Sequence, residues 1–155
     1  MKKMFKIINF YKLLSISITN CRNLYKIDFL SDKDKTQFLI HYMLKNIIET
    51  VIELHKSNQY LVILFNDDYY TDYLSKDDVL KLKNKIELIC KSLPILFANI
   101  KENEFNNMLD FFKEQICNKC DKFNLKKFKM ELKKNGMKQL YNNLQNDYMM
   151  GVFLS

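Results

Sequence analysis

The sequence predicts an α+β domain in which a mixed antiparallel sheet of five strands carries a long helix on one face and two C-terminal helices on the other. Residues 13–29, LLSISITNCRNLYKIDF, alternate apolar and polar side chains on both sides of NCRN. Such alternation around turn-forming residues is typical of a β-hairpin. A separate stripe of apolar residues, three or four positions apart, predicts one long helix. The stripe consists of Ile40, Leu44, Ile47, Val51 and Leu54.

The elements around this helix follow from local signals. SDKDKT at 31–36 offers N-cap residues and acidic groups for its first turn, and the helix is expected to end near Ser57-Asn58. Residues 59–65, QYLVILF, are too short an apolar run for a helix and predict a buried strand. After a turn at 66–68, the aromatic stretch 69–75, YYTDYLS, predicts another strand.

The second half of the chain is predicted to be mostly helical. For the insert at residues 76–92 the pattern favours a helix that ends before Pro94, although KIELIC at 85–90 alone would suit a strand. ILFANI at 95–100 is expected to be the last buried strand. Helices are expected after KENE at 101–104 and in two pieces, 125–134 and 137–148, separated by Asn135-Gly136 as a C-cap. We expect one domain over residues 1–155, with residues 1–12 as an extension in front of the hairpin.

The front of the chain does not fit a secretion signal. Asn9, Tyr11 and Lys12 interrupt its apolar residues, and no stretch approaches the roughly 20 apolar residues of a membrane span. We therefore expect a cytoplasmic protein whose four cysteines are reduced.

The charge is basic, with a net +7 and a pI near 9.1. Arg22 is the single arginine, however, and base recognition and phosphate clamping favour the bidentate guanidinium. We therefore expect no nucleic-acid partner. Residues 125–140 combine lysines with apolar residues, a pattern that predicts a helix packed on the sheet or lying against an anionic membrane.

No motif in the sequence indicates catalysis, a cofactor or a metal. Cys117 and Cys120 form a CxxC, but a zinc site needs two further ligands, and the spacing suits two small side chains one helical turn apart. His41 and His55 are almost four turns apart on the long helix, too far to share one metal ion. The acidic pairs Asp67-Asp68 and Asp77-Asp78 are explained by turns and caps. The chain is expected not to be an enzyme.

Four stretches carry a resemblance to a known family. They are SITNCRNLYKIDF, QFLIHYMLKNIIETVIE, YLVILFNDDYYTDYLS and ILFANIKENEFNNMLDFFKEQICNKC, and together they cover most of residues 13–123. The chain resembles the sedlin family, which comprises subunit 2 and its 2-like relative in the trafficking protein particle (TRAPP) complex. The family's Asn-Pro-Phe-Tyr stretch is replaced here by Asp121–Asn124.

The resemblance implies a longin, or SNARE-like, fold and a non-catalytic subunit of a tethering complex. Such a subunit acts in vesicle-mediated transport from the ER to the Golgi or within the Golgi, peripheral to those membranes. Its partners would be other TRAPP-type subunits and, through the complex, a Rab GTPase. Tyr69, Tyr70 and Tyr73 are the expected partner contacts, because tyrosine is enriched at interfaces.

Two alternatives remain open. One is another longin-type subunit, such as a clathrin-adaptor small chain. The other is an all-helical interaction protein of an AT-rich virus or bacterium.

Overall fold

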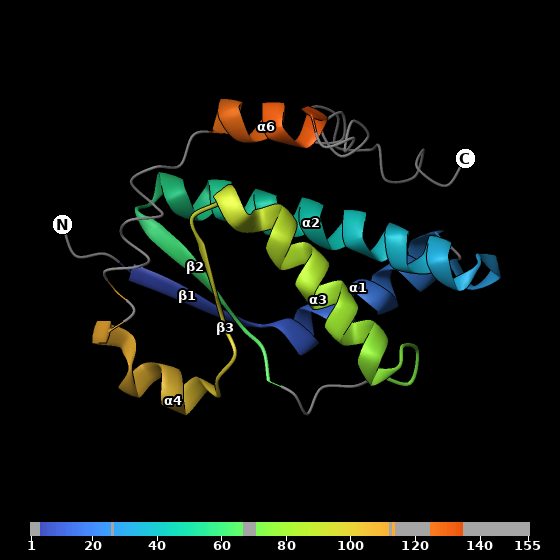
Figure 1. Cartoon of the computed structure of the whole chain (residues 1–155), viewed down its shortest axis with the longest axis horizontal. Helices are drawn as coiled ribbons and strands as arrows, with labels where there is room; N and C mark the ends of the chain where they lie inside the picture. The colour runs from blue at the N-terminus through green and yellow to red at the C-terminus, as the bar shows by residue number, and fades with distance from the viewer. Residues whose placement is uncertain (1–3, 26, 67–70, 112, 114–124, 135–155) are drawn as a thin grey trace.

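The computed structural model describes residues 4–25, 27–66, 71–111, 113 and 125–134 (Figure 1). Its elements in chain order are β1 (Met4–Asn9), α1 (Phe10–Tyr25), the 3-10 helix η1 (Ile27–Phe29), α2 (Asp32–Lys56), β2 (Gln59–Leu64), α3 (Lys76–Ile89), the 3-10 helix η2 (Cys90–Ser92), β3 (Ile95–Ala98), α4 (Glu102–Asn107) and α6 (Leu125–Lys134).

The three strands form a parallel sheet in the order β1-β2-β3. Ile7 lies opposite Val62, and Leu61 lies opposite Ile95. The connection from β1 to β2 runs through α1 and α2, and the connection from β2 to β3 runs through α3 (Figure 1). Parallel neighbours need such crossovers, because a tight turn can join only antiparallel strands.

The central strand β2 is covered on both faces, which explains its continuous apolar run. Leu61 and Ile63 point to a core formed with α1, α2 and α3, while Tyr60 and Val62 point to a smaller cluster on the opposite face. Phe105 of α4 closes that smaller cluster. A strand buried on both faces reads as uninterrupted hydrophobic sequence, as the central strand of a parallel sheet does.

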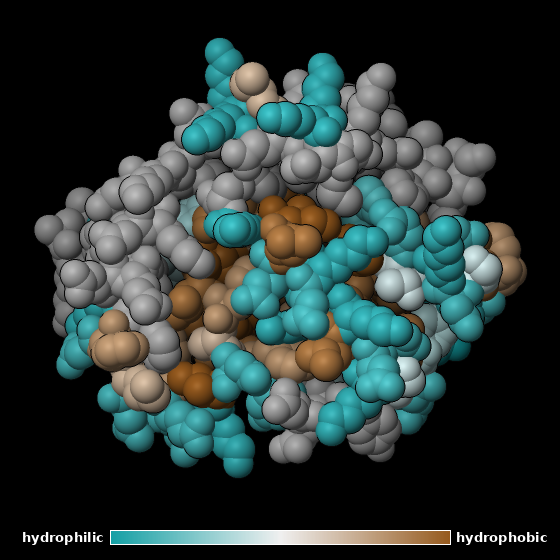
Figure 2. Space-filling model, in the orientation of Figure 1, coloured by the Kyte–Doolittle hydropathy of each residue, from teal (hydrophilic) through white to brown (hydrophobic). Residues whose placement is uncertain are grey.

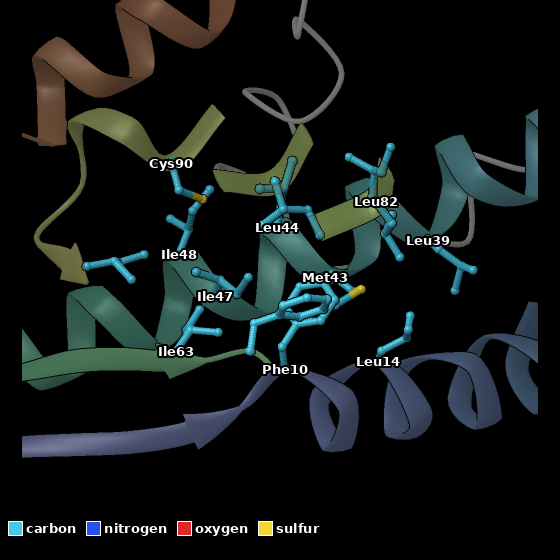
Figure 3. Close-up of a cluster of buried hydrophobic side chains, with 14 of the residues drawn as sticks. Phe10, Leu14, Leu39, Met43, Leu44, Ile47, Ile48, Ile63, Leu82 and Cys90 are labelled. Atoms are coloured by element: carbon cyan, nitrogen blue, oxygen red, sulfur yellow. The ribbon is translucent and has the colours of Figure 1, made fainter. Parts of the chain in front are cut away.

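The larger core is built mainly from the buried sides of α1 and α2 (Figure 3). Figure 3 shows side chains from both helices converging with Ile63 of β2, Leu82 of α3 and Cys90 of η2. This packing fixes where α2 and α3 lie relative to each other, and it therefore fixes the surface between them.

The predicted hairpin at 13–29 is wrong. Residues 10–25 form helix α1, which buries Phe10, Leu14, Ile18 and Cys21 on one side while Ile16 is 59% exposed. Burial at steps of four and three is helical, whereas a half-buried strand would bury Leu14, Ile16 and Ile18 together. The asparagines of NCRN therefore lie within the last turns of a helix.

The predicted longin fold is contradicted as well. Within the described residues the sheet has three parallel strands, where five strands in a mixed antiparallel arrangement were expected. Residues 4–9, part of the expected extension, form the edge strand β1, and residues 76–92, the expected insert, form α3 and η2 between two neighbouring strands. Residues 71–75 are not a strand, and 69–70 lie outside the described residues. The broad α+β description is consistent with the structure.

Other elements are confirmed. The long helix spans Asp32–Lys56, with Ser31 as its N-cap, and the strands at 59–64 and 95–98 lie where they were predicted. The chain leaves α2 through Asn58, whose positive φ of 56° is one that asparagine tolerates. The helix at 125–134 is α6, while the one expected at 137–148 lies outside the described residues.

Candidate anion-binding groove

A hollow of about 530 Å³ lies between the first turns of α2 and the first half of α3. Tyr73 and Leu74, from the segment that precedes α3, complete its lining. Helix α3 starts after β2 ends, and α2 runs toward the start of β2, so both helices begin on the side of the sheet where the strands end (Figure 1). Ligands of open parallel sheets bind on this side.

Four lysines line this hollow, which we call the α2–α3 groove. Lys33 and Lys35 come from the first turns of α2, and Lys81 and Lys85 lie one turn apart on α3. None of the four forms an ion pair with another side chain in the described part of the chain. Hydrophilic side chains lie over much of α3 in Figure 2, although Leu80 and Leu88 of this helix are also exposed. The groove therefore gathers ammonium groups from two helices without neutralising them in pairs.

The two aspartates in the lining, Asp32 and Asp78, belong to helix starts. The amide of Asp78 donates to Ser75 Oγ at 3.2 Å, and Ser75 Oγ in turn donates to the Asp78 carboxylate at 2.9 Å. Asp32 occupies the first turn of α2, where a negative charge complements the helix dipole. Because these carboxylates serve the helix termini and are outnumbered by the lysines, the groove keeps an excess of positive charge.

Tyr73 forms one wall of the groove and is held there by two cations. Arg22 Cζ and Lys35 Nζ each lie 5.0 Å from the centre of its ring, within range of a cation–π interaction. Thr71 Oγ1 accepts hydrogen bonds from the amides of Tyr73 at 3.3 Å and Leu74 at 2.8 Å, which fixes the turn that carries the ring. Tyr73 therefore joins α1, α2 and the start of α3.

The Tyr73 hydroxyl is buried near Asp28. Burial, followed by the effect of the Asp28 carboxylate, raises the pKa of Tyr73 to about 12. Among the described residues, the hydroxyl has no partner with ordinary hydrogen-bond geometry. The Asp28 carboxylate is nevertheless close enough to disfavour the negatively charged phenolate. The phenol therefore stays neutral and adds no charge to the groove.

His41 lies behind the groove and not in it. Its side chain is 5% exposed, and Nε2 lies 2.8 Å from Nε2 of Gln37, which is part of the groove lining. Burial, with a smaller effect of the Lys85 ammonium group, lowers the pKa of His41 to about 4. The imidazole is therefore neutral near pH 7, so the lysines supply the positive charge.

A second hollow, of about 500 Å³, shares Tyr73 with the first. It is lined mainly by α1 and by the segment Thr71–Tyr73. Its polar lining consists of Tyr11, Ser15, Thr19, Arg22, Thr71 and Asp72. We call it the α1 hollow.

Of the three tyrosines predicted as partner contacts, only Tyr73 falls within the described residues, and it lies between the two hollows. Tyr69 and Tyr70 lie outside them, as do Cys117, Cys120 and the pair Asp67-Asp68. Asp77 and Asp78 occupy the first turn of α3, whose N-cap is Ser75. The groove lysines were missed, because no local pattern distinguishes them from the other lysines of a basic chain.

No protein-family model, curated protein or solved structure matches this chain. Among the residues that the structure describes, no group of three or more His, Cys, Asp or Glu side chains could hold a metal ion. The described helices also include none with the length and apolar character needed to cross a membrane.

Proposed function

We propose that this chain is a binding protein for a phosphate-bearing ligand, which it takes up in the α2–α3 groove. The convergence of four lysines from two helices in one hollow carries this proposal. Lysine ammonium groups are compact point charges that suit phosphate oxygens, and charge-assisted hydrogen bonds are stronger than neutral ones. Phosphate carries close to two negative charges at neutral pH and so matches the excess of lysine over aspartate in the lining.

Binding, and not catalysis, is the role that this lining supports. Its described polar groups are the lysines, the two first-turn aspartates, Thr36, Gln37 and the neutral phenol of Tyr73. His41, the imidazole beside the groove, is buried against Gln37. It positions this lining residue and does not face a ligand. A cationic hollow of this kind attracts an anion and holds it through charge-assisted hydrogen bonds.

The vesicle-tethering role expected from the sedlin resemblance stays a prediction, and the α2–α3 groove does not support it. That role depended on a hairpin at 13–29 in a longin sheet, and residues 10–25 form α1 instead. The groove offers a function that depends on neither feature.

Calorimetric titration with pyrophosphate at low salt tests the proposal. The double variant Lys81→Gln/Lys85→Gln is expected to bind at least about tenfold more weakly than the wild type, because it removes two of the four positive charges. The matched control is Lys56→Gln/Lys91→Gln, which loses the same charge at exposed positions outside the lining. Equal affinities for the two double variants would contradict the proposal, because attraction would then come from net charge alone.

A further inference from the structure

The α1 hollow has a different chemistry from the groove beside it. Ser15 and Thr19 lie one turn apart on α1, and Tyr11 brings a further hydroxyl group to the same lining. These groups both donate and accept hydrogen bonds, and the Asp72 carboxylate adds a strong acceptor. Such a lining suits the hydroxyl groups of a polyol.

Negative charges outnumber the one positive charge at the α1 hollow. Arg22 Nε lies 3.2 Å from the Asp28 carboxylate, and Asp72 supplies a further negative charge. An anion entering this hollow would therefore meet no excess of positive charge, in contrast to the four lysines on the other side of Tyr73. The two hollows differ in what they attract: one attracts an anion, and the other a neutral molecule with many hydroxyl groups.

Tyr73 lines both hollows, so they adjoin at one side chain. Each has a volume within the range of small-molecule sites, which is about 300–1,000 Å³. We infer that the two hollows are the halves of one site for a phosphorylated sugar or other phosphorylated polyol. The phosphate binds the groove lysines, and the hydroxylated body passes Tyr73 into the α1 hollow.

This inference rests on the proposed function and adds the class of ligand to it. A single-stranded nucleic acid would also bring phosphates to the lysines, but its repeated charges need cations along the whole path and aromatic faces for stacking. The α1 hollow has no excess cation, and Arg22 and Lys35 already contact the ring of Tyr73. The asymmetry favours a ligand with one anionic end.

Calorimetry with four probes tests the inference: inorganic phosphate, glycerol 3-phosphate, ribose 5-phosphate and glucose 6-phosphate. At least one of the three phosphorylated polyols is expected to bind about tenfold more tightly than inorganic phosphate, through added hydrogen bonds in the α1 hollow. The variant Ser15→Ala/Thr19→Val changes no charge and is expected to remove this gain while leaving phosphate affinity unchanged. Thr50→Val, a helical threonine outside both hollows, is the control that keeps the gain.

The outcomes separate the inference from the function on which it rests. If the polyol phosphates bind no better than inorganic phosphate, or if Ser15→Ala/Thr19→Val keeps the gain, the inference is overturned and the proposed function stands. If neither pyrophosphate nor any of the four probes binds, both fail. A 12-nucleotide single strand that binds more tightly than every sugar phosphate would overturn the inference in favour of a nucleic-acid ligand.

Discussion

The rings of Phe10 and Phe65 meet edge to face, with centroids 5.6 Å apart and planes inclined at 73°. Phe10 is the first residue of α1, directly after β1, and Phe65 directly follows β2. The contact therefore joins the ends of two neighbouring parallel strands, on the side of the sheet where α2 and α3 begin. The amide of Phe65 also donates to the carbonyl of Ala98 at 2.9 Å, which ties this corner to β3.

Replacing Phe10 by alanine is expected to lower the free energy of unfolding by about 3–5 kcal/mol, because the ring is fully buried and its loss leaves a cavity. Urea unfolding followed by far-UV circular dichroism measures the change. The control is Phe29→Ala, at a side chain that is 75% exposed, with an expected change of about 0.5 kcal/mol or less. Similar losses for the two variants would mean that Phe10 does not pack as described.

The start of α3 gives a second prediction. Ser75 Oγ accepts the amide of Asp78, so Ser75→Ala is expected to lower the free energy of unfolding by about 1 kcal/mol. Ser75→Asp is expected to keep most of that stability, since a carboxylate also accepts this amide and suits a helix N-terminus. Urea unfolding of both variants checks the pair, and an aspartate variant as unstable as the alanine variant would argue against the cap.

The elements that could be predicted from the sequence are those whose burial pattern has one interpretation. The stripe from Ile40 to Leu54 extends over four turns, and only a helix buries such a stripe on one side. QYLVILF is too short for a helix and apolar on both faces, as a central strand must be. Neither element needed knowledge of the rest of the chain.

The hairpin prediction is wrong because two periods overlap in the sequence of α1. Leu14, Ile16 and Ile18 alternate with polar residues, but the longer series through Phe10 and Cys21 is helical, and it decides the fold. The buried Ser17 hydroxyl donates to the carbonyl of Leu13 at 2.7 Å, which lets a polar residue lie on the buried side of a helix. Asn9 supports the start of α1 by accepting the amide of Lys12 at 3.2 Å.

The candidate site could not be predicted from the sequence, for a different reason. Lys33 and Lys81 are far apart in the chain, and only the crossovers of a parallel sheet bring the starts of α2 and α3 together. Without that topology, the lysines look like ordinary solvated residues. The sequence predicts Tyr73 only as an interface residue, because its position between two hollows depends on the same tertiary arrangement.

The burial of His41 predicts a dependence of stability on pH. Its pKa is about 4 in the folded protein and 6.5 in the ordinary case. Between these values the unfolded chain binds a proton that the folded chain does not, so the free energy of unfolding falls as the pH is lowered from 6.5 toward 4. The contribution of this group is lost over that window and amounts to about 3 kcal/mol.

Urea unfolding of the wild type and of His41→Leu at pH 7, 5.5 and 4 measures this contribution. As the pH falls, the wild type is expected to lose more unfolding free energy than the variant, because leucine takes up no proton in either state. The carboxylates titrate in both proteins and largely cancel in the comparison. A difference that stays constant from pH 7 to 4 would show that His41 does not titrate as its burial requires.

The thiols of Cys21 and Cys90 are expected to be unreactive in the folded protein. Both are buried free cysteines, and burial raises the pKa of Cys21 to about 12 and that of Cys90 further still. The variant Cys117→Ser/Cys120→Ser leaves only these two thiols, so a chromogenic disulfide reagent at pH 8 reports on them alone. Native protein is expected to react roughly 100-fold more slowly than the same variant unfolded in urea, since the thiolate is the reacting form. If one thiol reacts in native protein at the unfolded rate, that cysteine does not lie in the core formed by α1, α2 and η2.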